Sequence, residues 1–97
     1  MNAATDKLRR NPAIEEAPLQ EELMLFDPKQ AKFFVLNSTM AFVWKNCDGG
    51  TSLSAIAERL TDEFSGVEID VALRDVHQAA TELSSLGLLL DVVFGNS

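Results

Sequence analysis

The feature that most constrains the fold of this 97-residue chain is a short apolar segment that runs directly into an amphipathic helix, at residues 32–44. Phe33 to Leu36 are the aromatic and branched residues that strands favour. Asn37 or Ser38 can then accept hydrogen bonds from the free N–H groups of a helix's first turn. Apolar residues recur beyond that cap at helical spacing, at Met40, Val43, Trp44 and Cys47. The segment therefore predicts a junction that presents a strand edge beside a packed layer of helices.

Two further strands are expected before this junction. Ala13–Pro18 is read as a short edge strand, because proline cannot donate a ladder hydrogen bond and suits an edge or a strand end. Glu22–Phe26 is a more strongly apolar strand. The Asp27-Pro28 step favours a turn, so that Lys32–Leu36 returns antiparallel in a hairpin with a loop of four or five residues.

Three helices are expected after the strands. The first runs from about Ser38 to Asn46 and ends at Asp48-Gly49-Gly50, since glycine readily adopts the left-handed conformation of a helix end. The second is capped by Thr51 or Ser52, and its apolar stripe is the clearest in the chain: Leu53, Ile56, Ala57, Leu60 and Phe64. The third is capped by Asp70 and covers about residues 71–86, followed by a short extended segment, Leu88–Leu90.

Strands followed by helices predict an α+β fold. We expect a three-stranded antiparallel sheet followed by three helices, compatible with a small winged helix-turn-helix-like domain. Residues 13–94 would form this single domain, with a flexible N-terminal tail at 1–12 and a frayed C-terminus at 95–97.

The charge distribution argues against nucleic acid as a partner. The net charge is −7; residues 1–49 carry six basic and seven acidic side chains, and residues 50–97 carry two basic and eight acidic ones. The third helix, which would read DNA in a winged helix, holds Asp70, Asp75 and Glu82 against Arg74 alone. No apolar run approaches the roughly 18 residues of a membrane span, and no signal peptide is evident, so we expect a cytoplasmic protein.

No catalytic or metal-binding set is visible. His77 and Cys47 are the only residues of their types, and each is better explained by packing than by reactivity. The carboxylate pairs Glu15-Glu16, Glu21-Glu22 and Asp62-Glu63 are adjacent in sequence, so that their side chains diverge and form solvated faces. We therefore expect no enzymatic activity, no cofactor and no metal.

The remaining feature is the apolar strand edge at 33–36. An unpaired edge in a monomer needs cover. A peptide partner can supply it by adding a strand, and so can the chain's own tail or a second copy. These alternatives leave a peptide-binding module, a self-associating structural protein and a winged-helix DNA-binding regulator as the functional classes to separate.

An ordered set of motifs resembles the PqqD-like family, the precursor-peptide recognition elements of pathways that modify ribosomally made peptides. The matching segments are Glu22–Pro28, the Leu36-Asn37 step with Val43-Trp44, Asp48–Ser52 with Ile56 and Leu60, and Asp75-Val76 with Leu83 and Gly87–Leu89. The resemblance covers about residues 14–90.

The resemblance implies a non-catalytic domain that binds a leader peptide as an added strand, between the third strand and the third helix. It also implies a partner that modifies the peptide: a radical S-adenosylmethionine enzyme, a peptidase or a cyclase. The peptide-binding residues so assigned are Lys32, Phe33, Phe34, Val35 and Leu36 on the strand, and Asp75, Gln78, Ala79 and Glu82 on the helix. The opposite helix flank, with Leu73, His77 and Ser84, is the alternative. Larger apolar residues are commoner in the family at Ala79-Ala80, so we expect a groove widened for a bulkier leader residue.

Overall fold

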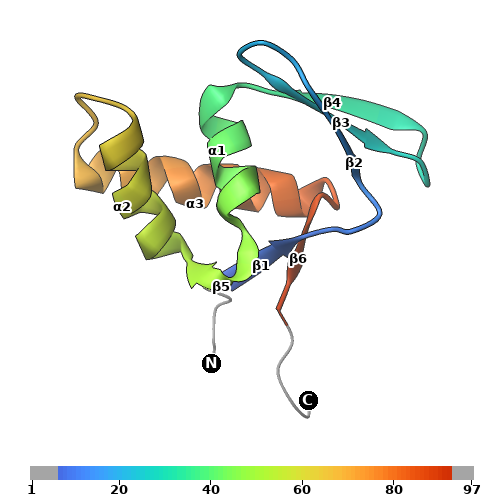
Figure 1. Cartoon of the computed structure of the whole chain (residues 1–97). Helices are drawn as coiled ribbons and strands as arrows, with labels where there is room; N and C mark the ends of the chain where they lie inside the picture. The colour runs from blue at the N-terminus through green and yellow to red at the C-terminus, as the bar shows by residue number, and fades with distance from the viewer. Residues whose placement is uncertain (1–6, 93–97) are drawn as a thin grey trace.

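The computed structural model describes residues 7–92 and has an α+β fold with two antiparallel sheets and three helices (Figure 1). The strands of the first sheet, in spatial order, are β2, β3 and β4, and those of the second are β5, β1 and β6. The elements are β1 (Lys7–Arg10), β2 (Glu15–Pro18), β3 (Leu23–Asp27), β4 (Lys32–Leu36), α1 (Ser38–Asn46), β5 (Asp48–Ser52), α2 (Leu53–Glu63), α3 (Ile69–Ser85) and β6 (Leu89–Asp91). None of the helices within residues 7–92 is long and apolar enough to cross a bilayer.

The β2-β3-β4 sheet agrees with the sequence prediction. β3 pairs with β4 from Leu23↔Leu36 to Asp27↔Lys32, so residues 28–31 form a four-residue hairpin loop. β2 is the short strand at the opposite edge. This part of the fold was predictable because strand patterning and turn chemistry are local properties of the chain.

The helices enclose one apolar core. α1 follows β4 after a single residue and lies between the first sheet and α2, in front of α3 in the view of Figure 1. The predicted caps of α1 and α2 are confirmed: Asn37 accepts from the Met40 backbone N–H, and Ser52 accepts from that of Ala55. The largest side chains withdrawn from solvent come from β3, all three helices and the segment before β6: Trp44, Leu23, Leu25, Ile56, Leu83 and Leu88.

The prediction of a flexible tail at residues 1–12 is wrong for residues 7–10. Residues 7–10 form β1, the central strand of the second sheet, and Leu8 is buried. The Arg10 guanidinium donates to the carbonyl oxygens of Lys45 (2.6 Å) and Trp44 (3.4 Å), which lie at the C-terminal end of α1. Helix ends leave such carbonyls without intrahelical partners, so a basic side chain from a distant strand stabilises the helix end.

The expected succession of three strands and three helices is also wrong, because β5 lies between α1 and α2. The segment Asp48-Gly49-Gly50 was expected to end a helix only, and it continues as a strand paired with β1. Gly49 does adopt a positive φ of 85°, which glycine tolerates without strain. A sequence containing two glycines has low strand propensity, and pairing with β1 overrides it.

The start of α3 and the segment after it were also predicted from the sequence. α3 begins at Ile69 with Glu68 at its cap position, so Asp70 lies in the first turn and is not the cap. The short extended segment is confirmed as β6, which pairs antiparallel with β1. The expected frayed end at 95–97 and the first half of the expected tail lie outside the described residues.

Candidate functional site

The β4 strand lies at the edge of its sheet, with β3 as its neighbour on one side (Figure 1). Successive side chains alternate between two faces. Phe33 and Val35 lie on the outer face and are 64% and 57% exposed, whereas Leu36 on the inner face is buried. The ring of Phe33 packs on that of Phe26 in β3, with centroids 4.6 Å apart. The edge therefore carries an exposed apolar surface on its outer side.

Asp27 stabilises the hairpin that presents this edge. Its carboxylate accepts hydrogen bonds from the Lys29 backbone N–H (3.0 Å) and the Gln30 side chain (2.7 Å). The bond from the Gln30 side chain, with those from the backbone N–H groups of Gln30 and Lys29, holds the pKa of Asp27 below its usual value. The carboxylate is thus ionised at neutral pH, and its hydrogen bonds stabilise the β3–β4 turn.

A groove of about 320 Å³ begins where β4 ends. We call it the α1–α3 groove. One wall comes from the junction of β4 and α1, and the other is a stripe of α3 residues at helical spacing. The lining residues are Asn37, Thr39, Met40, Asp75, Gln78, Ala79 and Glu82.

Both charged side chains that line this groove are carboxylates, Asp75 and Glu82. They are seven residues apart, which is roughly 10 Å along a helix axis. Arg74 is the nearest cation to Asp75, at 3.8 Å, and both side chains are well exposed. An exposed pair of this kind is worth less than about 1 kcal/mol. The groove therefore carries two negative charges among otherwise neutral lining residues.

Comparison with protein families gives a match to the model of coenzyme PQQ synthesis protein D over residues 22–89. This range covers more than half of the chain. The chain belongs to the PqqD family. The resemblance inferred from the sequence is therefore confirmed, whereas no curated protein sequence matches the chain.

Two solved structures are similar to this PqqD-family chain. A lasso peptide synthetase B1 complexed with the leader peptide has a TM-score of 0.75 and 30% identity, covering 87% of this chain and 98% of that one. TbiB1 in complex with the TbiA(beta) leader peptide has a TM-score of 0.73 and 21% identity, covering 84% of this chain and 93% of that one. At that identity, the second likeness concerns the fold alone.

In this PqqD-family domain, the four predicted α3 residues lie together. Asp75, Gln78, Ala79 and Glu82 all line the α1–α3 groove. The alternative flank does not line it: His77 is exposed, and Leu73 is half-buried against the core. The five predicted β4 residues form the edge that leads into the groove and are not part of its wall.

Sequence reasoning missed three residues of the groove: Asn37, Thr39 and Met40. Asn37 had been assigned only as a helix cap, and Met40 only as part of an apolar face. Both roles are real, since Asn37 does cap α1 and Met40 packs partly on the core. The short connection between β4 and α1 could have indicated these residues, because it forces the first turn of α1 to lie beside the end of the strand.

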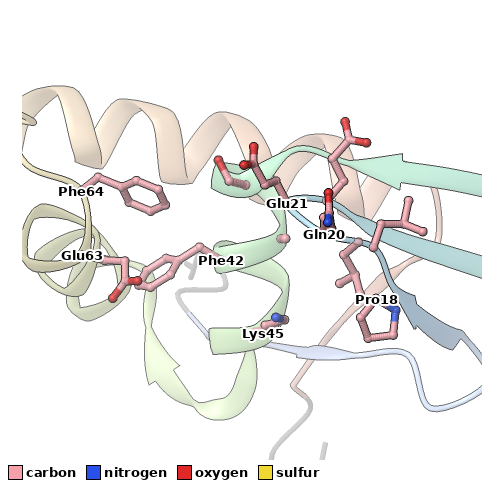
Figure 2. A pocket seen from close by; sticks show the side chains of 12 residues that line it. Pro18, Gln20, Glu21, Phe42, Lys45, Glu63 and Phe64 are labelled. Atoms are coloured by element: carbon pink, nitrogen blue, oxygen red, sulfur yellow. The ribbon is translucent and has the colours of Figure 1, made fainter.

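A second depression, of about 490 Å³, lies between α1, the end of α2 and the β2–β3 connection (Figure 2). We call it the α1–α2 cleft. Phe42 and Phe64 form its aromatic part, with ring centroids 5.8 Å apart. Its α1 residues, Ser38, Ala41, Phe42 and Lys45, differ from those that line the α1–α3 groove. The family resemblance assigns no residue of this cleft.

The two residues with intrinsic reactivity lie apart from the groove. Cys47 is fully buried, and burial raises the pKa of its thiol to about 11, so the thiol is protonated at neutral pH. His77 is exposed on α3. Among residues 7–92, no three histidine, cysteine or acidic side chains are grouped so that they could hold a metal ion.

Proposed function

We propose that this PqqD-family domain is a non-catalytic peptide-binding module. It captures the leader of a ribosomally made precursor peptide by strand addition and presents it to a modifying enzyme. The observation that carries the proposal is the outer edge of β4, which no strand within residues 7–92 covers and which leads into the α1–α3 groove. An added strand would gain main-chain hydrogen bonds from the edge and side-chain contacts from the groove.

The similar lasso peptide synthetase B1 supports the proposal, because its structure was determined as a complex with the leader peptide. In our assignment, the leader lies along Lys32, Phe33, Phe34, Val35 and Leu36. Its inward side chains then meet Asp75, Gln78, Ala79 and Glu82 on α3. Placement on the α3 flank that carries His77 is less favourable, since that flank does not border the groove.

The modifying enzyme belongs to the same proposal. A radical S-adenosylmethionine enzyme, a peptidase or a cyclase would act on the presented peptide, in the cytoplasm. The packing of α2 on α3 across residues 64–68 supports a winged helix-turn-helix-like arrangement adapted to peptides. DNA is disfavoured as a ligand, because Asp70, Asp75 and Glu82 on α3 would repel phosphates.

Self-association is the second candidate, since the β4 edge could pair with the same edge of another copy in a homodimer. The exposure of Phe33 and Val35 favours this pairing. The net charge of −7 opposes it, because two copies repel each other. The two functions predict different behaviour in solution and can be separated by light scattering.

The test uses synthetic peptides from the small open reading frames that neighbour the gene. Each N-terminal half is labelled, and its binding is measured by fluorescence anisotropy; we expect one to bind with a Kd in the micromolar range or tighter. The binding peptide is then N-methylated at one residue at a time. Backbone groups of a strand point alternately toward and away from a neighbouring strand, so affinity should fall at every second residue.

Protein variants give the matched control. Phe34→Pro and Val35→Pro each remove one backbone N–H from β4. Alternate N–H groups of an edge strand point away from β3, so only one of the two variants removes a donor that an added strand could use. That variant should retain its circular dichroism spectrum and lose the peptide, while His77→Ala on the other α3 flank should bind normally. A protein that binds no neighbouring peptide and is a dimer by light scattering would instead favour self-association.

A further inference from the structure

The side chains around the β4 edge define what kind of peptide fits it. A strand added to β4 would continue both faces of the sheet, with alternate side chains on each face. Those on the outer face would lie beside Phe33 and Val35, which are the exposed apolar side chains of β4. Those on the inner face would point toward α3 and the α1–α3 groove. The two faces therefore impose different requirements on the same peptide.

The outer face favours apolar residues. Phe33 and Val35 are each more than half exposed, and the Phe26 ring extends the apolar surface into β3. Neighbouring strands place such side chains within contact distance. A Leu, Ile, Val or aromatic residue at alternate peptide positions would cover this surface and remove it from water.

The inner face favours a cation. Asp75 and Glu82 lie about two turns apart on α3 and both line the groove. The other lining residues are neutral: Asn37, Thr39, Met40, Gln78 and Ala79. No lysine or arginine is among these lining residues. Arg74 lies 3.8 Å from Asp75 but outside the lining, and because both side chains are exposed, this pair offsets the charge of Asp75 only weakly. An acidic peptide side chain would be repelled by both carboxylates, whereas a basic one would be attracted by both and could contact one of them.

The shape of the groove also suits lysine or arginine. Inward-facing residues of an extended strand repeat about every 6.6–7 Å, and the two carboxylates are roughly 10 Å apart along α3. A long basic side chain from one inward position can therefore reach a carboxylate while its aliphatic stem covers Met40 and Ala79. The small side chain of Ala79 leaves room for that stem.

We propose that the cognate leader carries a lysine or arginine that enters the α1–α3 groove against Asp75 and Glu82. Apolar residues at the alternating positions cover Phe33 and Val35. This inference rests on the proposed function, since it concerns the peptide bound at the same edge. It adds the chemical class of the bound segment: a short strand with a cationic inner face and an apolar outer face.

The test measures binding of the leader found by anisotropy to wild-type protein, Asp75→Asn, Glu82→Gln and the double variant. We expect the double variant to bind about three- to tenfold more weakly at low salt, with the difference shrinking at about 0.5 M salt as charges are screened. The matched control is Glu58→Gln with Asp62→Asn on α2. It removes the same net charge from exposed residues that line neither the groove nor the cleft. The control should bind as wild type does.

Peptide variants complete the test. Replacing the basic residue within the N-methyl-sensitive segment by glutamate should weaken binding to wild type, and Glu82→Lys should restore part of it. A leader that binds with no basic residue in that segment would overturn the inference and leave the proposed function intact. So would a double variant of unchanged affinity. If no leader binds wild-type protein at all, the proposed function and the inference both fail.

Discussion

The indole Nε1 of Trp44 donates a hydrogen bond of 3.0 Å to Oε2 of Glu16, and this bond joins α1 to β2. Trp44 is buried, as its helical position predicted, whereas Glu16 was expected to be simply solvated. One oxygen of that exposed carboxylate instead accepts a hydrogen bond from the only polar atom of the indole. The bond fastens the first sheet to the helical layer, and so helps to fix β4 relative to the α1–α3 groove.

Glu16→Ala should therefore lower the free energy of unfolding by about 1–2 kcal/mol, because a buried indole N–H loses its acceptor. Urea unfolding followed by Trp44 fluorescence measures this effect. Glu16→Gln keeps an acceptor oxygen and is the control, with a loss of well under 1 kcal/mol expected. Equal stability of all three proteins would mean that water satisfies the indole equally well.

Leu8→Ala should lower the free energy of unfolding by about 2–3 kcal/mol, because a buried leucine of a central strand is truncated. The neighbouring Lys7→Ala, at an exposed position of the same strand, should change it by less than about 0.5 kcal/mol. Chemical denaturation of the two variants gives the comparison. If Leu8→Ala were as stable as wild type, the packing of the Leu8 side chain would contribute nothing to the stability of the fold.

Ala79→Leu should weaken leader binding at least about fivefold, which corresponds to about 1 kcal/mol. Ala79 lines the α1–α3 groove, and the added carbons would occupy the space assigned to the peptide side chain. His77→Leu places the same side chain on the opposite flank of α3 and should leave affinity unchanged. Anisotropy titrations of the two variants decide the point, and unchanged affinity in Ala79→Leu would contradict a widened groove.

Cys47 should make stability fall as the pH rises through the alkaline range. Burial raises the thiol pKa from 9.0 to about 11 in the folded protein, so the unfolded chain loses this proton first. The contribution of Cys47 is complete below about pH 9 and declines until about pH 11. Across this range, denaturation should show the unfolding free energy of wild type falling relative to that of Cys47→Ala. A constant difference between the two proteins would contradict the raised pKa.

Much of the candidate site was predictable from local patterns. The β4 edge follows from its aromatic and branched residues and from the Asp27-Pro28 turn before it. The α3 stripe follows from the spacing of Asp75, Ala79 and Glu82, which places them on one side of the inner face. The side of α3 that borders the groove could not be chosen in this way, because both flanks are equally consistent with the helical period.

The sequence by itself determined the elements whose stability is local: the hairpin, the capped helices and the apolar stripe of α3. Only the tertiary structure decided the role of residues 7–10, the strand at 48–52 and the partnership of Trp44 with Glu16. The physical reason is that these features depend on partners tens of residues away. A four-residue strand with one apolar side chain, or one containing two glycines, has little preference of its own and becomes a strand only when its neighbour is present.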